Sequence, residues 1–306
     1  MQRFILARFA QSFFTLWALS FVVFISVHLT GDPVLALLPL EDANDEGIAR
    51  LKEKLGLDKS KAEQYLIFMK HAVQLDFGQS VKEYRPAIDV LVERIPATLQ
   101  LTVAGMGLAI ALGIPLGMLA AVRPNSVFDY LSKLFAVIGM ATPQFWVGIM
   151  AVLFFGAYLK LLPTFGRGGP DHYILPAFVL SWPIMAGMMR LTRSSMLEIL
   201  DSEFIKFSRV KGLRENLVLW KHALRNAIIP LLTFSGISLA GLLNGSVVVE
   251  VVFAWPGVGR LLLDSVVNRD FPVVQATVLL SALFYLLTAL IVDILYAYTD
   301  PRIRFD

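Results

Sequence analysis

Six long stretches of this sequence contain no Asp, Glu, Lys or Arg. Each has 18 or more residues, close to the roughly 20 that an α-helix needs to cross the hydrocarbon core of a bilayer. Helices suit that environment because they satisfy their own backbone hydrogen bonds in lipid. The sequence therefore predicts an all-α membrane protein with six transmembrane helices. The stretches are residues 9–31, 95–122, 134–159, 172–189, 226–249 and 271–292.

Composition supports the same class of protein. Charged residues make up 17% of the chain and the mean hydropathy is +0.67, whereas soluble domains average about 25% charged residues. This difference excludes an ordinary soluble enzyme. The 306 residues include no Cys, which excludes a disulfide framework, a thiolate metal site and a cysteine nucleophile.

The first apolar stretch follows Arg3 and Arg8, as in a signal peptide. It is longer than the usual apolar region of about 7–15 residues in a signal peptide, and no small-x-small cleavage site follows it. We therefore expect residues 1–31 to form a retained N-terminal transmembrane helix.

Residues 32–94 are expected to form a small extracytoplasmic helical segment. Asn44 can cap one short amphipathic helix. Ser60 and Glu63 have the spacing of a capping box at the start of a second helix. The remaining residues, 95–306, then contain the other five membrane helices.

The distribution of Lys and Arg predicts the orientation of the spans. With the N-terminus in the cytoplasm, the cytoplasmic segments hold 14 basic residues and the opposite side holds 13. Residues 32–94 carry 9 of those 13, but a segment longer than about 60 residues does not control topology. Without it the counts are 14 and 4. Both termini are therefore expected in the cytoplasm.

The most informative part of the chain is the basic, amphipathic segment 190–229. Two short helical patterns meet at Gly212, each with apolar positions at helical spacing. A helix pair lying in the lipid headgroups and a surface that docks another protein explain this pattern equally well. The apolar positions are Phe204, Phe207 and Val210 before the glycine and Leu217, Trp220, Leu224 and Ile228 after it.

This segment resembles a known family. Residues 202–213, followed by His222-Ala223-Leu224-Arg225-Asn226-Ala227, are similar to the EAA loop of bacterial ABC-importer permeases of the dipeptide, oligopeptide, nickel and glutathione transport family. At residues 207–212 this chain has Phe-Ser-Arg-Val-Lys-Gly, where that family usually has Thr-Ala-Arg-Ala-Lys-Gly. Other matching motifs include Gly31-Asp32-Pro33, Asp76-Phe77-Gly78-Gln79-Ser80, Arg193-Ser194-Ser195-Met196, Trp255-Pro256-Gly257-Val258-Gly259-Arg260 and Asp300-Pro301-Arg302-Ile303-Arg304.

The resemblance implies a type I ABC-importer permease fold in the bacterial inner membrane, with a permease core at 95–306 and a coupling loop at 201–229. Such a permease forms a heterodimer with a second homologous permease. The heterodimer works with two ATPase subunits and a periplasmic binding protein. ATP and Mg would be bound by the ATPases, since this chain has no G-x-x-x-x-G-K-[ST] motif. No cofactor of its own and no nucleic-acid partner are expected. The implied coupling residues are Glu203, Phe204, Phe207, Arg209, Lys211, Gly212, Leu213, Arg214, His222 and Arg225.

A second candidate region lies on the opposite side of the membrane. Residues 251–270 start apolar and then turn at Pro256-Gly257. Non-helical backbone at membrane depth persists only where it is buried in protein or lines a cavity. We expect a re-entrant element at an outer gate that contacts the partner permease or the binding protein; a plain surface turn is the alternative. The candidates are Trp255, Pro256, Gly257, Gly259 and Arg260 for this contact, and Asn244, Gly245 and Glu250 for the substrate path.

Two other functions compete with this interpretation. An ion-coupled secondary transporter or channel needs ionisable groups inside the membrane, and Glu250 and Asp293 each lie at the end of an uncharged run. An intramembrane enzyme has less support. The four histidines are too dispersed for a zinc site, and Gly236-Ile237-Ser238-Leu239 lacks the second glycine of a nucleophile elbow. We expect no catalytic residue and no metal site.

The sequence alone does not determine which solute is carried. In the family that the chain resembles, the binding protein selects the ligand and the permease provides the path. Short peptides are favoured. Dipeptides, oligopeptides, glutathione, nickel chelates and some oligosaccharides are all compatible with the sequence.

Overall fold

The computed structural model describes residues 2–30 and 59–299. Within these ranges the regular secondary structure is helical, and the described residues contain no β-strand beyond one isolated bridge. They form two compact units. The core unit, as we call it, contains residues 99–255 and 288–299, and the N-terminal unit contains the described parts of 2–98 together with 256–287.

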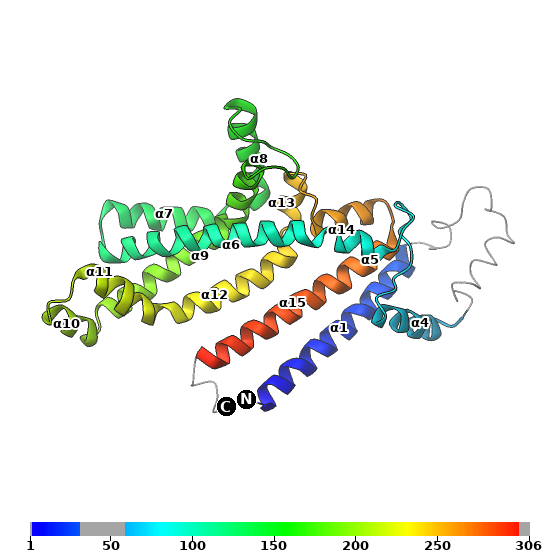
Figure 1. The fold of residues 1–306 in the computed structure, drawn as a ribbon, viewed down its shortest axis with the longest axis horizontal. Helices are drawn as coiled ribbons and strands as arrows, with labels where there is room; N and C mark the ends of the chain where they lie inside the picture. Colours follow the sequence, from blue (N-terminus) through cyan, green and yellow to red (C-terminus); the bar gives the residue numbers. More distant parts are fainter. Residues whose placement is uncertain (1, 31–58, 300–306) are drawn as a thin grey trace. The chain divides into compact units, whose positions relative to one another are not determined.

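Helix α9 (Asp171–Leu200) lies at the centre of the core unit (Figure 1). Its buried side chains extend over most of its length, as expected of a helix that is covered on several sides. The helices that pack against it include α7 (Val127–Ala141), α8 (Gln144–Ala151), α12 (Leu224–Gly245) and α13 (Val247–Val252).

Helix α6 (Ile95–Val122) approaches α9 very closely at Gly117. A Cβ on this glycine would lie 2.5 Å from the carbonyl oxygen of Met189 and 2.7 Å from the Cβ of Thr192. Small residues permit such contacts between membrane helices, where packing has to supply the attraction that the hydrophobic effect supplies in water. Any side chain at this position would therefore push the two helices apart.

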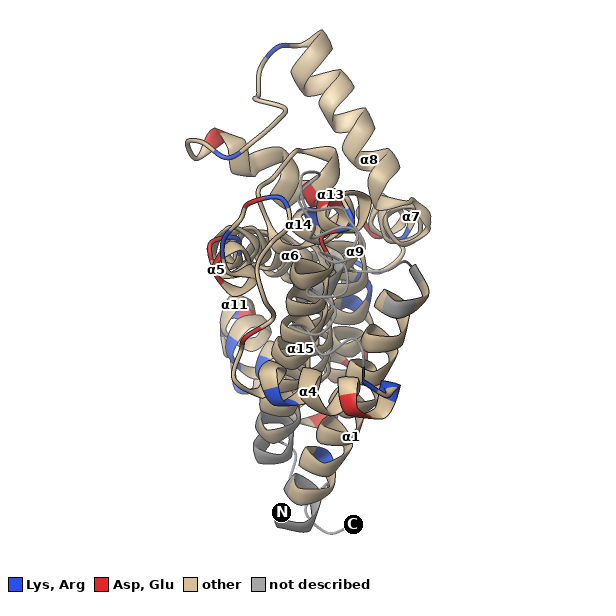
Figure 2. Ribbon diagram, turned by 90° about the vertical axis from the view of Figure 1, so that its right-hand side faces the viewer, with Lys and Arg blue, Asp and Glu red and all other residues tan. Residues whose placement is uncertain are grey.

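The stretch 134–159, expected to form one transmembrane helix, is broken in the structure. Helices α7 and α8 are bent by 105° relative to each other. Pro143 explains the break, because a proline disfavours the helical conformation of the residue before it, and Thr142 is extended with ψ 127°. Helix α8 continues as the π-helix η2 (Val152–Tyr158). Figure 2 shows no charged residue along the α8 ribbon.

Five helices in the described chain are long and apolar enough to cross a membrane, and there are six if the bent pair of α7 with α8 and η2 is one span. The prediction of six spans agrees with the structure when this pair counts as one broken span. The five other candidate spans are Leu6–Val27, Ala87–Val122, Asp171–Leu200, Glu215–Leu242 and Phe271–Val292.

In the N-terminal unit, α4 (Lys61–Val73) packs against α1 (Gln2–Thr30). The predicted capping box at Ser60 and Glu63 is confirmed, with the side chain of each accepting the backbone N–H of the other. The hydroxyl groups of Tyr65 and Ser20 are 2.8 Å apart and join the two helices. The helix expected after Asn44 lies outside the described residues.

Three further helices complete the N-terminal unit. An apolar cluster joins α5 (Ala87–Val92) to the beginning of α15 (Phe271–Thr299), and side chains of α14 (Val258–Val267) pack against it. The buried members of the cluster are Ala87, Val90, Leu91, Val273 and Ala276.

Candidate functional site

The coupling segment, by which we mean residues 201–229, begins with an anchored helix. Helix α10 (Glu203–Val210) follows α9 after a short bend and lies at the end of the core unit where α9 ends (Figure 1). The Ile205 side chain is fully buried in an apolar cluster with residues from α6, α9 and α12. Helix α10 is therefore fixed by side-chain packing as well as by its covalent connections to the neighbouring segments. The buried cluster consists of Met118, Ala121, Met196, Ile205, Val218, Ala223 and Ala227.

The opposite side of α10 presents three large apolar side chains. Phe204, Phe207 and Val210 are 44%, 58% and 83% exposed, respectively. Their spacing of three residues places them on one side of the helix. Helix α10 thus joins a buried anchor to an apolar surface that the described part of the chain leaves exposed.

Gly212 terminates α10 with a left-handed backbone, φ +76°. Its N–H donates to the Arg209 carbonyl at 2.9 Å, and the Leu213 N–H donates to the Ser208 carbonyl at 3.4 Å. These two bonds form a Schellman motif, which satisfies carbonyls left open at a helix end. No described atom lies within 4 Å of the position that a Cβ on Gly212 would take. The turn predicted at Gly212 is confirmed. Glycine is favoured there by the left-handed backbone and not by a lack of space for a side chain.

Beyond the turn the chain returns through α11 (Glu215–Leu217) and the π-helix η3 (Val218–Ala223) into α12. The Arg209 guanidinium donates two hydrogen bonds, of 2.7 and 3.2 Å, to the Glu215 carboxylate. Both side chains are partly exposed, so the pair contributes only about 0–1 kcal/mol. Its geometric effect is to join the two sides of the Gly212 turn.

Of the apolar stripe expected after Gly212, Leu217 and Trp220 are exposed, and Leu224 and Ile228 are partly buried. Val218 and Ala223, both in η3, are fully buried. The π-helix η3 explains why residues at α-helical spacing differ in exposure here, because its i→i+5 hydrogen bonds place more residues in each turn than an α-helix has.

The basic side chains of α10 have partners within the segment. Lys206 lies 3.1 Å from a Glu203 carboxylate oxygen and 3.3 Å from one of Asp201. Hydrogen bonds to Glu203 and Asp201 raise the pKa of Lys206 above its usual value. The Lys211 ammonium lies 4.6 Å from the centre of the Phe207 ring, a cation–π distance. Of the other coupling candidates, Arg214 and Arg225 are exposed, and Leu213 and His222 are partly buried.

Sequence reasoning missed a buried ionic cluster in the same unit. Asp129 of α7 is fully buried and accepts hydrogen bonds from the Arg193 guanidinium of α9. Lys133 lies 2.9 Å from the same carboxylate, and the Asn125 N–H donates to it at 3.0 Å. This cluster fixes the start of α7 against α9. The only signal in the sequence was Arg193, which lies in a motif shared with the family that the chain resembles. That motif did not indicate Asp129 as its partner.

The substrate-path candidates are not brought together on an open surface. Glu250 of α13 is fully buried, and the Ser246 hydroxyl donates to its carboxylate at 2.8 Å. A side chain enclosed in this way does not line an open cavity. Asn244 and Gly245 fall outside the side chains that the structure describes.

The turn after α13 is packed inside the core unit. Phe253 and Trp255 are fully buried, and the Trp255 and Tyr173 rings lie 4.8 Å apart with an interplanar angle of 76°. The Phe253 carbonyl accepts the Gly166 N–H at 2.8 Å. Non-helical backbone is thus covered by protein, as expected at membrane depth. Trp255, expected to contact a partner, is instead covered by its own chain and supports the turn from inside.

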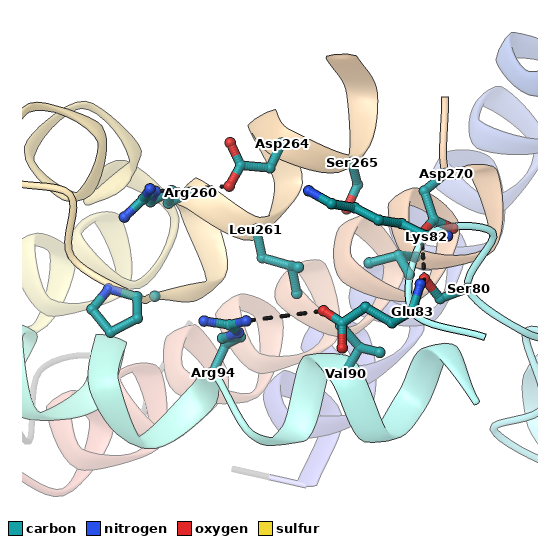
Figure 3. A pocket seen from close by; sticks show the side chains of 13 residues that line it. Ser80, Lys82, Glu83, Val90, Arg94, Arg260, Leu261, Asp264, Ser265 and Asp270 are labelled. Carbon is teal, nitrogen blue, oxygen red and sulfur yellow. Dashed lines mark hydrogen bonds and ion pairs between the residues drawn. The ribbon is translucent and has the colours of Figure 1, made fainter. Parts of the chain in front are cut away.

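The other outer-gate candidates belong to the N-terminal unit. Pro256, Gly257 and Arg260 line a pocket of about 200 Å³ (Figure 3), and Gly259 is buried in α14.

The fold is that of an ABC-importer permease. The chain is similar to the MetNI methionine ABC transporter solved in inward-facing conformations, with a TM-score of 0.58 and 19% identity over 69% of this chain and 96% of that one. It is also similar to an amino acid ABC transporter solved with histidines, with a TM-score of 0.51 and 15% identity over 70% of this chain and 94% of that one. These likenesses confirm the type I permease fold predicted from the sequence.

The chain belongs to the family described as binding-protein-dependent transport system inner membrane component, whose model matches residues 113–305. The model of the family's N-terminal part matches residues 1–102. Glutathione transport system permease proteins GsiC of Escherichia coli K12 and of Shigella dysenteriae serotype 1 are each 42% identical over 292 residues, covering 95% of this chain and 95% of theirs. The protein is therefore a multi-pass inner-membrane permease subunit of an ABC importer. The comparisons give no support to a secondary transporter or channel.

Proposed function

We propose that this permease carries glutathione or a related short peptide into the cell. The support is the 42% identity, over nearly the whole of both chains, to permeases of glutathione transport systems. The proposal includes a heterodimer with a second homologous permease, a periplasmic binding protein that delivers the solute, and two ATPase subunits that bind ATP and Mg. In this proposal the chain itself carries no catalytic residue and no cofactor.

The proposed orientation places both termini in the cytoplasm, together with the coupling segment. Its support is the count of 14 basic residues against 4 once the segment 32–94 is set aside. Single cysteines introduced at Lys59 and Asn216, both exposed, test it in a chain that has no Cys of its own. The first should react with an impermeant thiol reagent added outside, and the second should not. The reverse labelling pattern would contradict the orientation.

The coupling role is carried by one observation. Helix α10 is fixed by Ile205 in a cluster shared with α6, α9 and α12, while Phe204 and Phe207 face outward. An ATPase that contacts the exposed side would transmit its movement through Ile205 into the membrane helices. The coupling residues named from the resemblance and the division of the chain at residues 31 and 94 remain parts of this proposal.

Replacing Phe207 with Ala tests the contact. Trp220 is the matched control, since it is an aromatic residue of the same segment with similar exposure, 55% against 58%. The Phe207 variant should insert normally but lose ATPase subunits during purification, whereas the Trp220→Ala complex should stay whole. A Phe207→Ala complex that stays whole and transports at the normal rate would exclude this face as the docking surface.

The transport function is tested with the complete importer in proteoliposomes. Uptake of labelled glutathione should require the binding protein, stop with an ATPase-inactive partner and continue with an uncoupler. Uptake that continues without ATP hydrolysis but stops with the uncoupler would contradict the proposal. Mass spectrometry of the ligand carried by the binding protein encoded alongside would identify the solute directly.

Asn244, Gly245 and Glu250 remain our proposal for the substrate path. Because Glu250 is enclosed in this structure, the proposal requires α13 to move before a solute can reach it. Glu250→Gln should then reduce the uptake of cationic peptides more than that of neutral peptides. Equal uptake of both would remove Glu250 from the path.

A further inference from the structure

The pocket in the N-terminal unit combines residues that are far apart in the sequence. One wall comes from residues 80–94 around α5, and the other comes from α14 and the start of α15. Its lining is mainly charged or polar, and Figure 3 shows these side chains converging from both walls. The charged residues are Lys82, Glu83, Arg94, Arg260, Asp264 and Asp270.

The anions of this pocket already have partners. Asp270 is buried and accepts hydrogen bonds from the Ser80 hydroxyl and the N–H groups of Val81 and Lys82. Glu83 lies 2.6 Å from the Arg85 guanidinium. Asp264 lies 3.7 Å from Arg260. The pocket therefore has little capacity left for a cation.

Two cations of the pocket are less well satisfied. The Lys82 ammonium has no hydrogen bond or ion pair with the described residues, and Figure 3 shows its side chain extended across the pocket toward α14. Arg94 reaches Glu83 only at 4.0 Å, the limit of an ion pair. Its Nε atom is buried and has no hydrogen-bond partner in the described chain. A buried donor without a partner is unfavourable, so Arg94 favours an incoming anion, and the exposed Lys82 ammonium adds a second positive charge to the same pocket.

The volume of the pocket limits the size of the anion that it can hold. Its volume of about 200 Å³ is below the roughly 300–1,000 Å³ of pockets that enclose whole small-molecule ligands. The rim carries charges of both signs, as the polar rim of a protein–protein interface does. A single carboxylate side chain fits both the volume and the open donors.

We propose that this pocket receives one Asp or Glu side chain from a protein that docks on this face of the permease. The inserted carboxylate accepts hydrogen bonds from the Lys82 ammonium and the Arg94 guanidinium. This inference rests on the proposed function, which places the pocket outside the cytoplasm and makes the binding protein the docking partner. Pro256, Gly257 and Arg260, predicted to form an outer contact, belong to the same pocket.

The test uses the complete importer in nanodiscs and the binding protein encoded alongside, loaded with its ligand. Lys82→Gln and Arg94→Gln are compared with Lys70→Gln, which removes the same charge from an exposed position of α4. Each pocket variant should weaken binding-protein affinity roughly tenfold, since a charge-assisted hydrogen bond is lost. The Lys70 variant should bind normally, and the basal ATPase rate should be unchanged in all three.

A second arm identifies the inserted group. Each exposed Asp and Glu of the binding protein is replaced by its amide, and one replacement should weaken binding without further loss when it is combined with Lys82→Gln. Additive losses for every pair would overturn the proposal. Lys82 is exposed, so its variant should fold even if Arg94→Gln does not.

The remaining outcomes are separable. Unchanged binding-protein affinity with a raised KM for the peptide solute would assign the carboxylate to the solute and overturn the docking proposal. Unchanged affinity and unchanged uptake would also overturn it. Neither result affects the proposed function, which is tested separately by whether uptake through the wild-type importer requires the binding protein and ATP hydrolysis.

Discussion

The coupling segment and the turn after α13 are built from similar parts but end in opposite environments. Each has a short helix followed by a left-handed residue, Gly212 with φ +76° in one and Ala254 with φ +49° in the other. Each carries large aromatic side chains next to the turn. In the coupling segment Phe204 and Phe207 are exposed, whereas Phe253 and Trp255 beside Ala254 are fully buried.

The difference comes from the neighbouring helices. Helix α13 packs against both α8 and α9, so its turn is covered by other parts of the core unit. Helix α10 lies at the end of α9 and buries one side chain, Ile205, while its opposite side stays open. An aromatic residue beside a turn is therefore buried as an internal support in one place and exposed in the other.

The largest effect is expected from Trp255→Ala. Removing a fully buried aromatic side chain leaves a cavity and should destabilise the fold by about 3–5 kcal/mol. Thermal unfolding in detergent, with Trp220→Ala as the exposed control, measures this effect. Similar unfolding temperatures for the two variants would remove the contrast between the two regions.

Gly212→Val should have a smaller effect on stability and a larger one on assembly. The left-handed backbone costs a residue with a Cβ about 1–2 kcal/mol, and the space around the position is open. The variant should insert at normal abundance but lose ATPase subunits on purification, whereas Gly212→Asn should retain them because Asn tolerates this conformation. If the Val complex stays whole and transports, Gly212 is not required for coupling.

Ala254→Gly should act in the opposite direction. Relief of the left-handed strain, reduced by the greater chain entropy of glycine, should stabilise the core unit by about 0.5–1 kcal/mol. The same thermal unfolding measurement checks the sign. A lower unfolding temperature would show that the Ala254 methyl group contributes more through packing than its backbone costs.

The smallest effect concerns Lys206. Glu203 and Asp201 raise the pKa of Lys206 above the usual 10.5. The stability that Lys206 gives to the segment is therefore fully present below pH 10.5 and is lost as the pH rises through its folded-state pKa. At pH 8, a spin label at Val210 should be slightly more mobile in Lys206→Gln than in the segment that keeps Lys206. Above the folded-state pKa of Lys206, the label should be equally mobile in both. Lys221→Gln is the control, and a difference that persists at high pH would contradict the assignment.

The sequence by itself determined the features that depend on local chemistry. Six uncharged runs indicated the membrane spans, Ser60 and Glu63 indicated a helix start, and Gly212 indicated a turn. These inferences were confirmed because capping, backbone conformation and transfer into lipid depend on residue types close together in the chain.

Only the tertiary structure decided which apolar side chains are covered. Burial of Trp255 depends on Tyr173, far away in the sequence, and the π-helix η3 shifts the buried side of the coupling segment away from α-helical spacing. The pairing of Asp129 with Arg193 and the convergence of Lys82 and Arg94 on one pocket likewise join separate helices. Residue types constrain such contacts only weakly, because a side chain's environment is set by whichever distant segment packs against it.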